Sequence, residues 1–247
     1  FDMFEALNTT GEQLTAYETF KPKVVQAEGL GSYQASPSYK YLEITDNYLN
    51  SSQTSNERLK NTSELLTSFA LAESGTKLSN KLSDQRRQLS RTYDKLGNNS
   101  INDQRSFTQF LSHVALVLDE AWPSNKETSP KFSVLTNADT SEIKLCLDLL
   151  RQTNHRITIA PIVRFYSEAI GADTPDRPIK VTELKRAILA VTAFSVLWRM
   201  SRHSTDGIDT HYRNIMEKGI ADLSIEPFAR CVNYTATSSI SANELQK

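Results

Sequence analysis

The sequence predicts a mainly α fold, an irregular bundle of many helices. Only eight glycines and eight prolines occur in 247 residues, which is few for a turn-rich β protein. Apolar residues recur at intervals of three and four residues along most of the chain, as they do on one face of an amphipathic helix. No repeat with a period of about 30 to 50 residues is evident, so the bundle is not expected to be a solenoid.

The first helix is expected to begin at Thr15. Thr15 and Glu18 form a capping-box pattern, in which each side chain accepts a hydrogen bond from the backbone N–H of the other residue. The helix should continue to about Glu28, although Pro22 falls in its second turn, where a proline kinks or ends a helix. The two glycines within residues 29–32 should then end it.

Apolar spacing predicts the next helices. Ser36 and Pro37 start one helix, and the stretch rich in Ser, Gln and Thr at residues 50–56 is a candidate domain boundary. Beyond it, apolar residues at helical intervals predict helices over about 59–70 and 78–96, whose apolar faces suit an antiparallel pair.

The clearest amphipathic stripe runs from Phe107 to Trp122 and predicts a further helix. A polar stretch follows, and residues 123–140 are a candidate sub-boundary. Helices are then expected over 142–151 and 161–170, the second opened by a proline, which the first turn of a helix tolerates.

A long helix is expected to be capped by Thr182 and to reach Trp198. This segment is apolar nearly all round, so it should be the central buried element. A last helix is expected over about 209–218, and the rest of the chain has weaker periodicity, which favours only short helices.

The charge balance gives no global attraction to nucleic acid or to an anionic membrane. Lys and Arg total 28 and Asp and Glu total 29, a formal net charge of −1, so any DNA contact has to be local. The longest apolar run, residues 187–198, is shorter than the about 20 residues that cross a bilayer. Cys146 and Cys231 form neither a disulfide framework nor a zinc set, which fits a reducing cytoplasm.

The most informative motif is FEALNTTGEQLT at residues 4–15. Gly11 takes a positive φ without steric cost, so the residues around it are expected to form a tight turn. That turn would aim Asn8 and neighbouring amides at the positive end of the helix that begins at Thr15. This geometry suits a phosphate or another anion.

The same residues resemble the second signature of the GmrSD-type modification-dependent restriction proteins, whose N-terminal domain is related to the ParB/sulfiredoxin fold. The matching positions are Phe4, Glu5, Leu7, Asn8, Gly11, Leu14 and Thr15. In that family the signature lies beside a nucleotide pocket, whose other half is an upstream Asp-Gly-Gln-Gln-Arg motif, and a His-centred nuclease motif usually follows downstream. This sequence contains neither of those motifs. The chain is therefore expected to be the middle portion of a larger protein.

The resemblance implies that residues 1–50 are the C-terminal part of a nucleotide-binding domain and that residues 51–247 form a helical domain. It implies a nucleoside triphosphate with magnesium as the ligand of the complete protein, bound but not hydrolysed by this portion alone. The implied nucleotide-binding residues are Glu5, Asn8, Thr9, Thr10, Gly11 and Gln13. Glu5 or Asn8 would support the metal through an oxygen ligand. The alternative is that Asn8 and Thr10 only satisfy amides of the turn.

Two other clusters contain residues that could carry chemistry. Arg86, Arg87 and Arg91 lie on one charged helix and are candidate contacts to a DNA backbone, although a solvated helix face has the same composition. Residues 199–213 combine Arg, His, Ser and Asp, the groups of a phosphodiester site. Helix-end charges and an ordinary turn also account for this second cluster, and its histidine spacing does not suit a metal.

Two functions follow from these observations. The first is the helical middle portion of a GmrSD-like DNA restriction or phage-defence protein, which forms one wall of a nucleotide pocket and a scaffold that connects this pocket to a nuclease domain or subunit. The second is a non-enzymatic interaction module that binds a partner protein or a second copy, because no complete catalytic set is present. No membrane contact is expected in either case.

Overall fold

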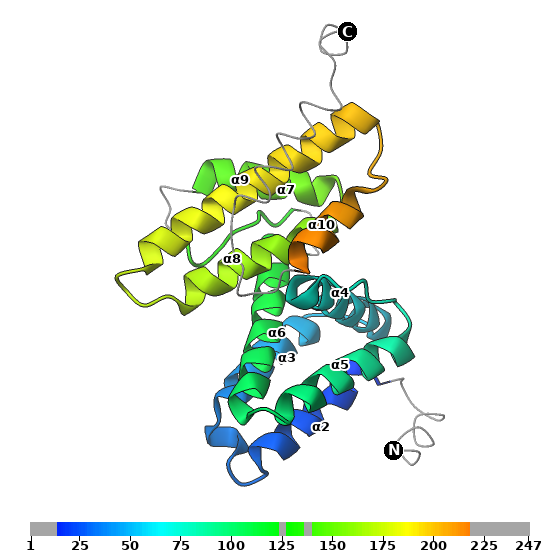
Figure 1. Ribbon diagram of the computed structural model, residues 1–247, viewed down its shortest axis with the longest axis vertical. Coiled ribbons are helices and arrows are strands. Elements are labelled where there is room, and N and C mark those ends of the chain that lie inside the picture. The colour runs from blue at the N-terminus through cyan, green and yellow to red at the C-terminus, as the bar shows by residue number, and fades with distance from the viewer. Residues whose placement is uncertain (1–13, 124–126, 136–139, 218–247) are drawn as a thin grey trace, which may run out of the picture. The chain divides into compact units, whose positions relative to one another are not determined.

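The computed structural model describes residues 14–123, 127–135 and 140–217, and these residues form helices with no β-strand among them (Figure 1). The predicted mainly α, multi-helix fold is therefore confirmed. The ParB/sulfiredoxin-like edge stays a prediction, because most of its signature lies outside the described residues. Within the described ranges, no helix has the length and apolar character needed to cross a membrane.

Two compact units divide the chain, and each is described by itself. Among the described residues, the first unit contains 14–67 and 78–116, and the second contains 68–77, 117–123, 127–135 and 140–217. The boundaries predicted from the sequence concern domains rather than these units, so they stay predictions.

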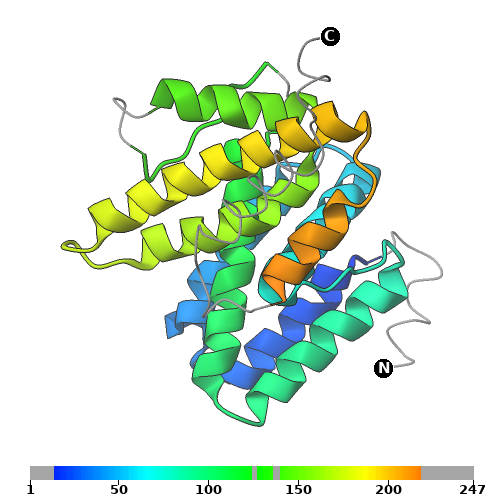
Figure 2. The ribbon, with the colours of Figure 1, turned by 45° about the horizontal axis from the view of Figure 1, so that its top comes forward.

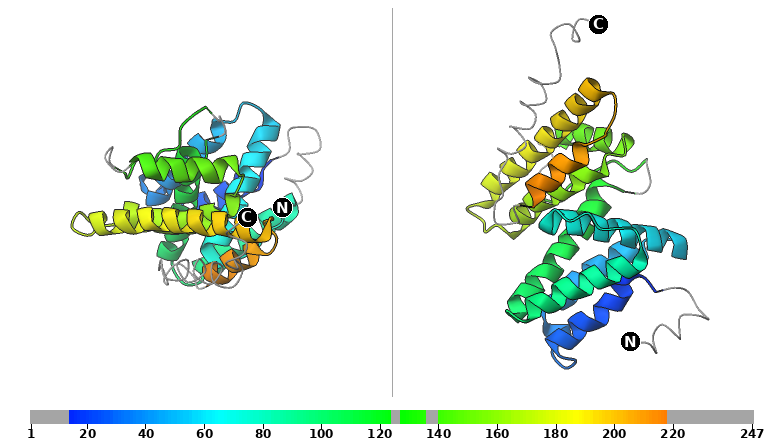
Figure 3. Two further views of the ribbon diagram at one scale, coloured as in Figure 1. Left: turned by 90° about the horizontal axis from the view of Figure 1, so that it is seen from above. Right: turned by 45° about the vertical axis from the view of Figure 1, so that its right-hand side comes forward.

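The first unit contains α2 (Ala16–Glu28), η1 (Tyr33–Ala35), α3 (Pro37–Asn50), α5 (Leu82–Gly97) and parts of α4 (Ser55–Ser74) and α6 (Ile101–Ala121). Helices α2 and α5 lie side by side (Figure 3). The rings of Phe20, Tyr93 and Phe107 meet edge to face in the core, with centroids 5.0, 5.8 and 6.0 Å apart. Helix α5 packs along α2, where Tyr93 contacts Phe20. It also contacts α4, its predicted partner, where the Gln85 side-chain amide donates to the Ser63 hydroxyl at 2.8 Å.

Helix α2 begins where the sequence predicts. The Thr15 hydroxyl accepts the Glu18 N–H at 3.1 Å, and the Glu18 carboxylate accepts the Thr15 N–H at 2.7 Å, so the capping box is complete. Pro22 lies inside the helix without ending it. Gly29 ends it at a φ of 82°, a conformation that only glycine adopts without strain.

The second unit contains α7 (Thr140–Gln152), η3 (Arg156–Thr158), α8 (Ile159–Gly171), α9 (Arg177–Arg202) and α10 (Ile208–Met216), with the remaining residues of α4 and α6. Helix α9 lies between α7 and α8 (Figure 2). Helix α8 is buried without interruption from Ile159 to Tyr166. The helices predicted in this part of the sequence are confirmed, with ends that differ by a few residues.

Helix α9 differs from its prediction in two respects. It follows the N-cap residue Asp176, because Pro178 in its first turn already has the φ of a helix. Thr182, the predicted cap, lies inside the helix, where its hydroxyl donates to the Pro178 carbonyl oxygen at 2.9 Å. The predicted segment is buried on one side rather than all round, since Thr182, Arg186 and Ala193 are exposed.

Candidate functional site

The first turn of α2 is the described part of the site that the sequence predicts. The predicted nucleotide-binding residues Glu5, Asn8, Thr9, Thr10, Gly11 and Gln13 lie outside the described residues, so their roles stay predictions. The described chain begins at Leu14, directly before the N-cap residue Thr15. The helix start that the motif is expected to face is therefore in place.

Two arginines from other helices reach this first turn. Arg86 of α5 donates from Nη2 to the Leu14 carbonyl oxygen at 2.6 Å. Arg58 of α4 forms an ion pair with Glu18, in which Nη2 lies 3.0 Å from Oε1. The Nε atoms of both arginines are buried and have no hydrogen-bond partner in the described part of the chain. Two positive charges against one carboxylate, at the positive end of a helix, favour the binding of an anion here.

A cleft of about 840 Å³ opens along one face of α2, beginning at this first turn. Its volume lies in the range of small-molecule binding sites. Helix α2 and the residue after its C-cap supply most of the walls, while α3 and α4 each supply one charged side chain. The described lining residues are Tyr17, Glu18, Lys21, Pro22, Val25, Gln26, Leu30, Asp46 and Arg58.

Asp46 of α3 is bound by two side chains of α2. Its carboxylate lies 2.5 Å from the Lys21 ammonium and accepts a hydrogen bond from the Tyr17 hydroxyl at 3.0 Å. Burial and the negative charge of Asp46 raise the pKa of the Tyr17 phenol, so this hydroxyl remains a proton donor. Lys21 and Asp46 are 40% and 23% exposed, which leaves this pair accessible from the cleft.

Apolar side chains form the other part of the cleft. Pro22, Val25 and Leu30 line it, and Leu30 is 86% exposed. Because Pro22 has no N–H, the carbonyl oxygen of Glu18 cannot receive the usual helical hydrogen bond and remains an acceptor beside the cleft. The cleft therefore combines an apolar wall with charged side chains, a surface suited to a ligand that has both characters.

The three candidate DNA-contacting arginines do not share one environment. Arg86 is half-buried and is held by the Leu14 carbonyl, whereas Arg87 and Arg91 are exposed one helical turn apart. Arg87 pairs with Asp84 at 3.1 Å, which reduces the positive charge on this face. The structure brings Arg87 and Arg91 together and turns Arg86 toward the start of α2, and DNA contact stays a prediction.

The cluster at residues 199–213 is occupied by contacts within the second unit. The Arg202 guanidinium lies 4.5 Å from the centre of the Trp198 ring, and the His211 ring meets the same tryptophan edge to face. Arg213 pairs with Asp209 one turn away. No group of three or more His, Cys, Asp or Glu in the described ranges is arranged to hold a metal ion. These contacts agree with the structural interpretation of the cluster.

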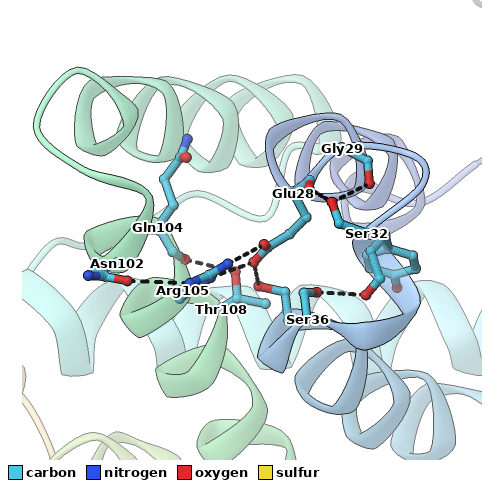
Figure 4. A network of polar contacts seen from close by, with 10 residues as sticks. Glu28, Gly29, Ser32, Ser36, Asn102, Gln104, Arg105 and Thr108 are labelled. Atoms are coloured by element: carbon cyan, nitrogen blue, oxygen red, sulfur yellow. Dashed lines mark hydrogen bonds and ion pairs between the residues drawn. The ribbon is translucent and has the colours of Figure 1, made fainter.

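A buried ion pair in the first unit was not indicated by the sequence analysis (Figure 4). The Glu28 carboxylate accepts bonds from Arg105 Nε and Nη2 at 2.9 and 2.8 Å and from the Ser38 hydroxyl at 2.6 Å. The bond from Arg105 lowers the pKa of Glu28. The one signal of this ion pair in the sequence is the acidic residue Glu28 in the last turn of a helix, where the helix dipole disfavours a negative charge.

Comparison with known proteins finds no family model and no curated protein that matches this chain. The resemblance to the GmrSD type therefore depends on the motif at residues 4–15 alone.

Proposed function

We propose that this chain binds a nucleoside triphosphate at the start of α2, as the helical middle portion of a GmrSD-like DNA restriction or phage-defence protein. One observation carries the proposal: a cleft of about 840 Å³ begins at the first turn of α2, directly after the motif, and Arg58 and Arg86 flank this turn. A nucleotide has an anionic part and an apolar part, and this cleft has a complementary surface for each.

In this proposal the phosphates bind the turn at residues 8–13 and the two arginines. The base lies against the apolar wall formed by Pro22, Val25 and Leu30. A magnesium ion that accompanies the nucleotide is bound by an oxygen of Glu5 or Asn8, since Mg²⁺ prefers oxygen ligands. The helical part then transmits nucleotide binding to a nuclease domain or subunit, which cleaves DNA held in part by Arg87 and Arg91.

Nucleotide affinity tests the pocket. Binding of a fluorescent ATP analogue with Mg²⁺ is measured for the full chain and for Asn8→Ala and Arg58→Ala. Loss of one hydrogen bond to a charged group is worth about 1.5–3 kcal/mol, so each variant should bind about 10- to 100-fold more weakly. Arg91→Ala, which changes an exposed arginine outside the cleft, is the matched control and should bind as the native chain does. Equal affinity of all four proteins would contradict the pocket.

Salt dependence tests the DNA contacts separately. If Arg87 and Arg91 each bind one phosphate, their replacement by alanine should reduce the slope of log affinity against log salt by about 0.9 per residue. Lys144→Ala on α7 serves as a control for loss of one positive charge elsewhere. If the variant with both Arg87 and Arg91 replaced has the same salt slope as the native chain, these two arginines do not contact DNA.

A second candidate is a non-enzymatic interaction module. The observation that favours it is the engagement of the described polar clusters in contacts within each unit, which leaves no described catalytic set. A chain that binds no nucleotide but retains a protein partner would support this second function over the first.

A further inference from the structure

Helix α9 carries two apolar stripes on opposite sides. The inner stripe consists of Leu184, Ile188, Val191, Ser195 and Trp198, which alternate at intervals of four and three residues and are buried in the second unit. The inner stripe is the face by which α9 packs against α7 and α8.

The outer stripe has the same alternating spacing, and its members are exposed or half-buried. Its apolar members are Ile179, Leu189, Ala193, Val196 and Met200. Ile179, Ala193 and Met200 are exposed, and Leu189 and Val196 are half-buried. Thr182 and Arg186 complete the alternation and are exposed as well. An apolar stripe of this length on a surface usually marks an interaction site.

The spacing of the outer stripe identifies the geometry of its occupant. Positions 179, 186, 193 and 200 are seven residues apart, and positions 182, 189 and 196 follow the same period. A seven-residue repeat with alternating steps of three and four is the pattern by which one α-helix packs along another. The stripe is about 30 Å long at 1.5 Å per residue, which corresponds to three heptads of a second helix.

Arg186 indicates what that second helix carries. It lies within the stripe, is exposed, and has no ion pair with the described residues. Two copies of α9 in parallel would place Arg186 against Arg186. Two copies aligned antiparallel over their full length would place it against Leu189, Ala193 or Val196. Neither arrangement supplies a carboxylate, and a polar residue at such a position selects the partner that satisfies it.

We propose that the outer stripe of α9 binds an amphipathic helix of another protein, with an apolar seam of alternating three and four spacing and an Asp or Glu opposite Arg186. This surface lies in the second unit, whereas the proposed nucleotide cleft lies in the first. The two proposals therefore fail independently, and each has its own binding assay.

A pair of designed peptides tests the proposal on the full chain. Each is a three-heptad helix with Leu along its seam, made in registers for both chain directions, and it carries either Glu or Lys at the seam position facing Arg186. Fluorescence anisotropy should show at least tenfold tighter binding of the Glu peptide. Arg186→Glu should reverse this order, which non-specific apolar adhesion cannot do. Equal affinities of the two peptides for the native chain would overturn the proposal.

Two matched variants show whether the stripe itself is the binding surface. Ala193→Glu places a charge in the middle of the stripe and should abolish binding of the Glu peptide. Ala27→Glu makes the same change at an exposed alanine of α2 and should leave binding unchanged. Circular dichroism establishes that both variants keep their helices. A dimer in sedimentation equilibrium that Ala193→Glu dissociates would overturn the proposed partner in favour of a second copy of this chain.

Discussion

The two units bury charge in different ways. In the first unit, the side chain of Glu28 is 2% exposed and meets the Arg105 guanidinium, which is a counter-charge. In the second unit, Arg164 of α8 is also 2% exposed, and its described partners are the backbone carbonyl oxygens of Ala72, Glu73 and Met216. These carbonyls lie at the C-terminal ends of α4 and α10, which are the negative ends of helix dipoles.

This difference shows that a buried charge can be stabilised by a group that titrates or by dipoles that do not. An ion pair loses its attraction when its carboxylate is protonated, whereas the carbonyls of a helix end keep their partial charges at every pH. The Glu28 site should therefore respond to acid.

Replacement of Arg164 by Met should have the largest effect on stability. Methionine fills part of the space but donates no hydrogen bond, so carbonyl oxygens at two helix ends become buried acceptors without that donor, at about 1–3 kcal/mol each. We expect the free energy of unfolding to fall by roughly 3–5 kcal/mol, measured by urea denaturation. Arg186→Met, the same change at an exposed arginine, should cost less than about 0.5 kcal/mol. Similar losses in both variants would contradict the role of the helix ends.

Each unit also contains one buried histidine that is neutral at pH 7 and therefore needs no counter-charge. Burial lowers the pKa of His113 to about 4, and burial together with the positive charge of Arg199 lowers the pKa of His155 to about 4. Below the ordinary value of about 6.5 the unfolded chain binds these protons first, so stability should decrease as the pH falls from about 6.5 to 4.

The loss from each histidine should be at most about 3 kcal/mol, from the size of the two shifts. Urea denaturation at intervals between pH 7 and pH 4 measures it. His113→Gln and His155→Gln should each flatten part of this pH dependence, whatever their stability at pH 7. A profile that both variants leave unchanged would show that these histidines titrate normally in the folded protein.

Replacement of Gly75 by Ala should lower the free energy of unfolding, because it pushes apart the ends of α4 and α10 that Arg164 joins. Gly75 has a φ of 71°, and a Cβ there would lie 2.7 Å from the Arg213 carbonyl oxygen and the Glu217 amide nitrogen. Both atoms belong to the backbone at the end of α10, so the two helix ends would have to separate. Strain and displacement together should cost roughly 2–3 kcal/mol of unfolding free energy. Gly171→Ala, where a Cβ would meet nothing within 4 Å, should be close to neutral.

The local elements of the fold were predictable because their signals are local. The capping box of Thr15 and Glu18 placed the start of α2, and the stripe from Phe107 to Trp122 placed α6. The start of α9 differs from its prediction because Thr182 resembles a cap, whereas Pro178 earlier in the chain already fits the first turn of a helix.

The sites that depend on distant contacts were not predictable from spacing. The backbone partners of Arg164 at Ala72 and Met216 lie 92 and 52 residues away, and Arg105 lies 77 residues from Glu28. A lone arginine inside an apolar segment and an acid at a helix C-terminus are weak signals that these charges have partners, but neither signal names the partner. The cleft on α2 was likewise missed, because two of its charges come from other helices.

The acid response of Glu28 is the smallest expected effect and the one that separates the two ways of burying charge. Because its folded pKa is lowered, Glu28 contributes stability above its ordinary pKa of about 4.3, and this contribution disappears as the pH falls through the lower folded value. Glu28→Gln keeps the shape of the side chain but not its charge, so it should cost about 1–2 kcal/mol at pH 7 and progressively less below about pH 4. Urea denaturation of both proteins between pH 7 and pH 3 measures the difference. A Glu28→Gln deficit that stayed constant down to pH 3 would mean that shape and packing, rather than the charge, determine the stability of this pair.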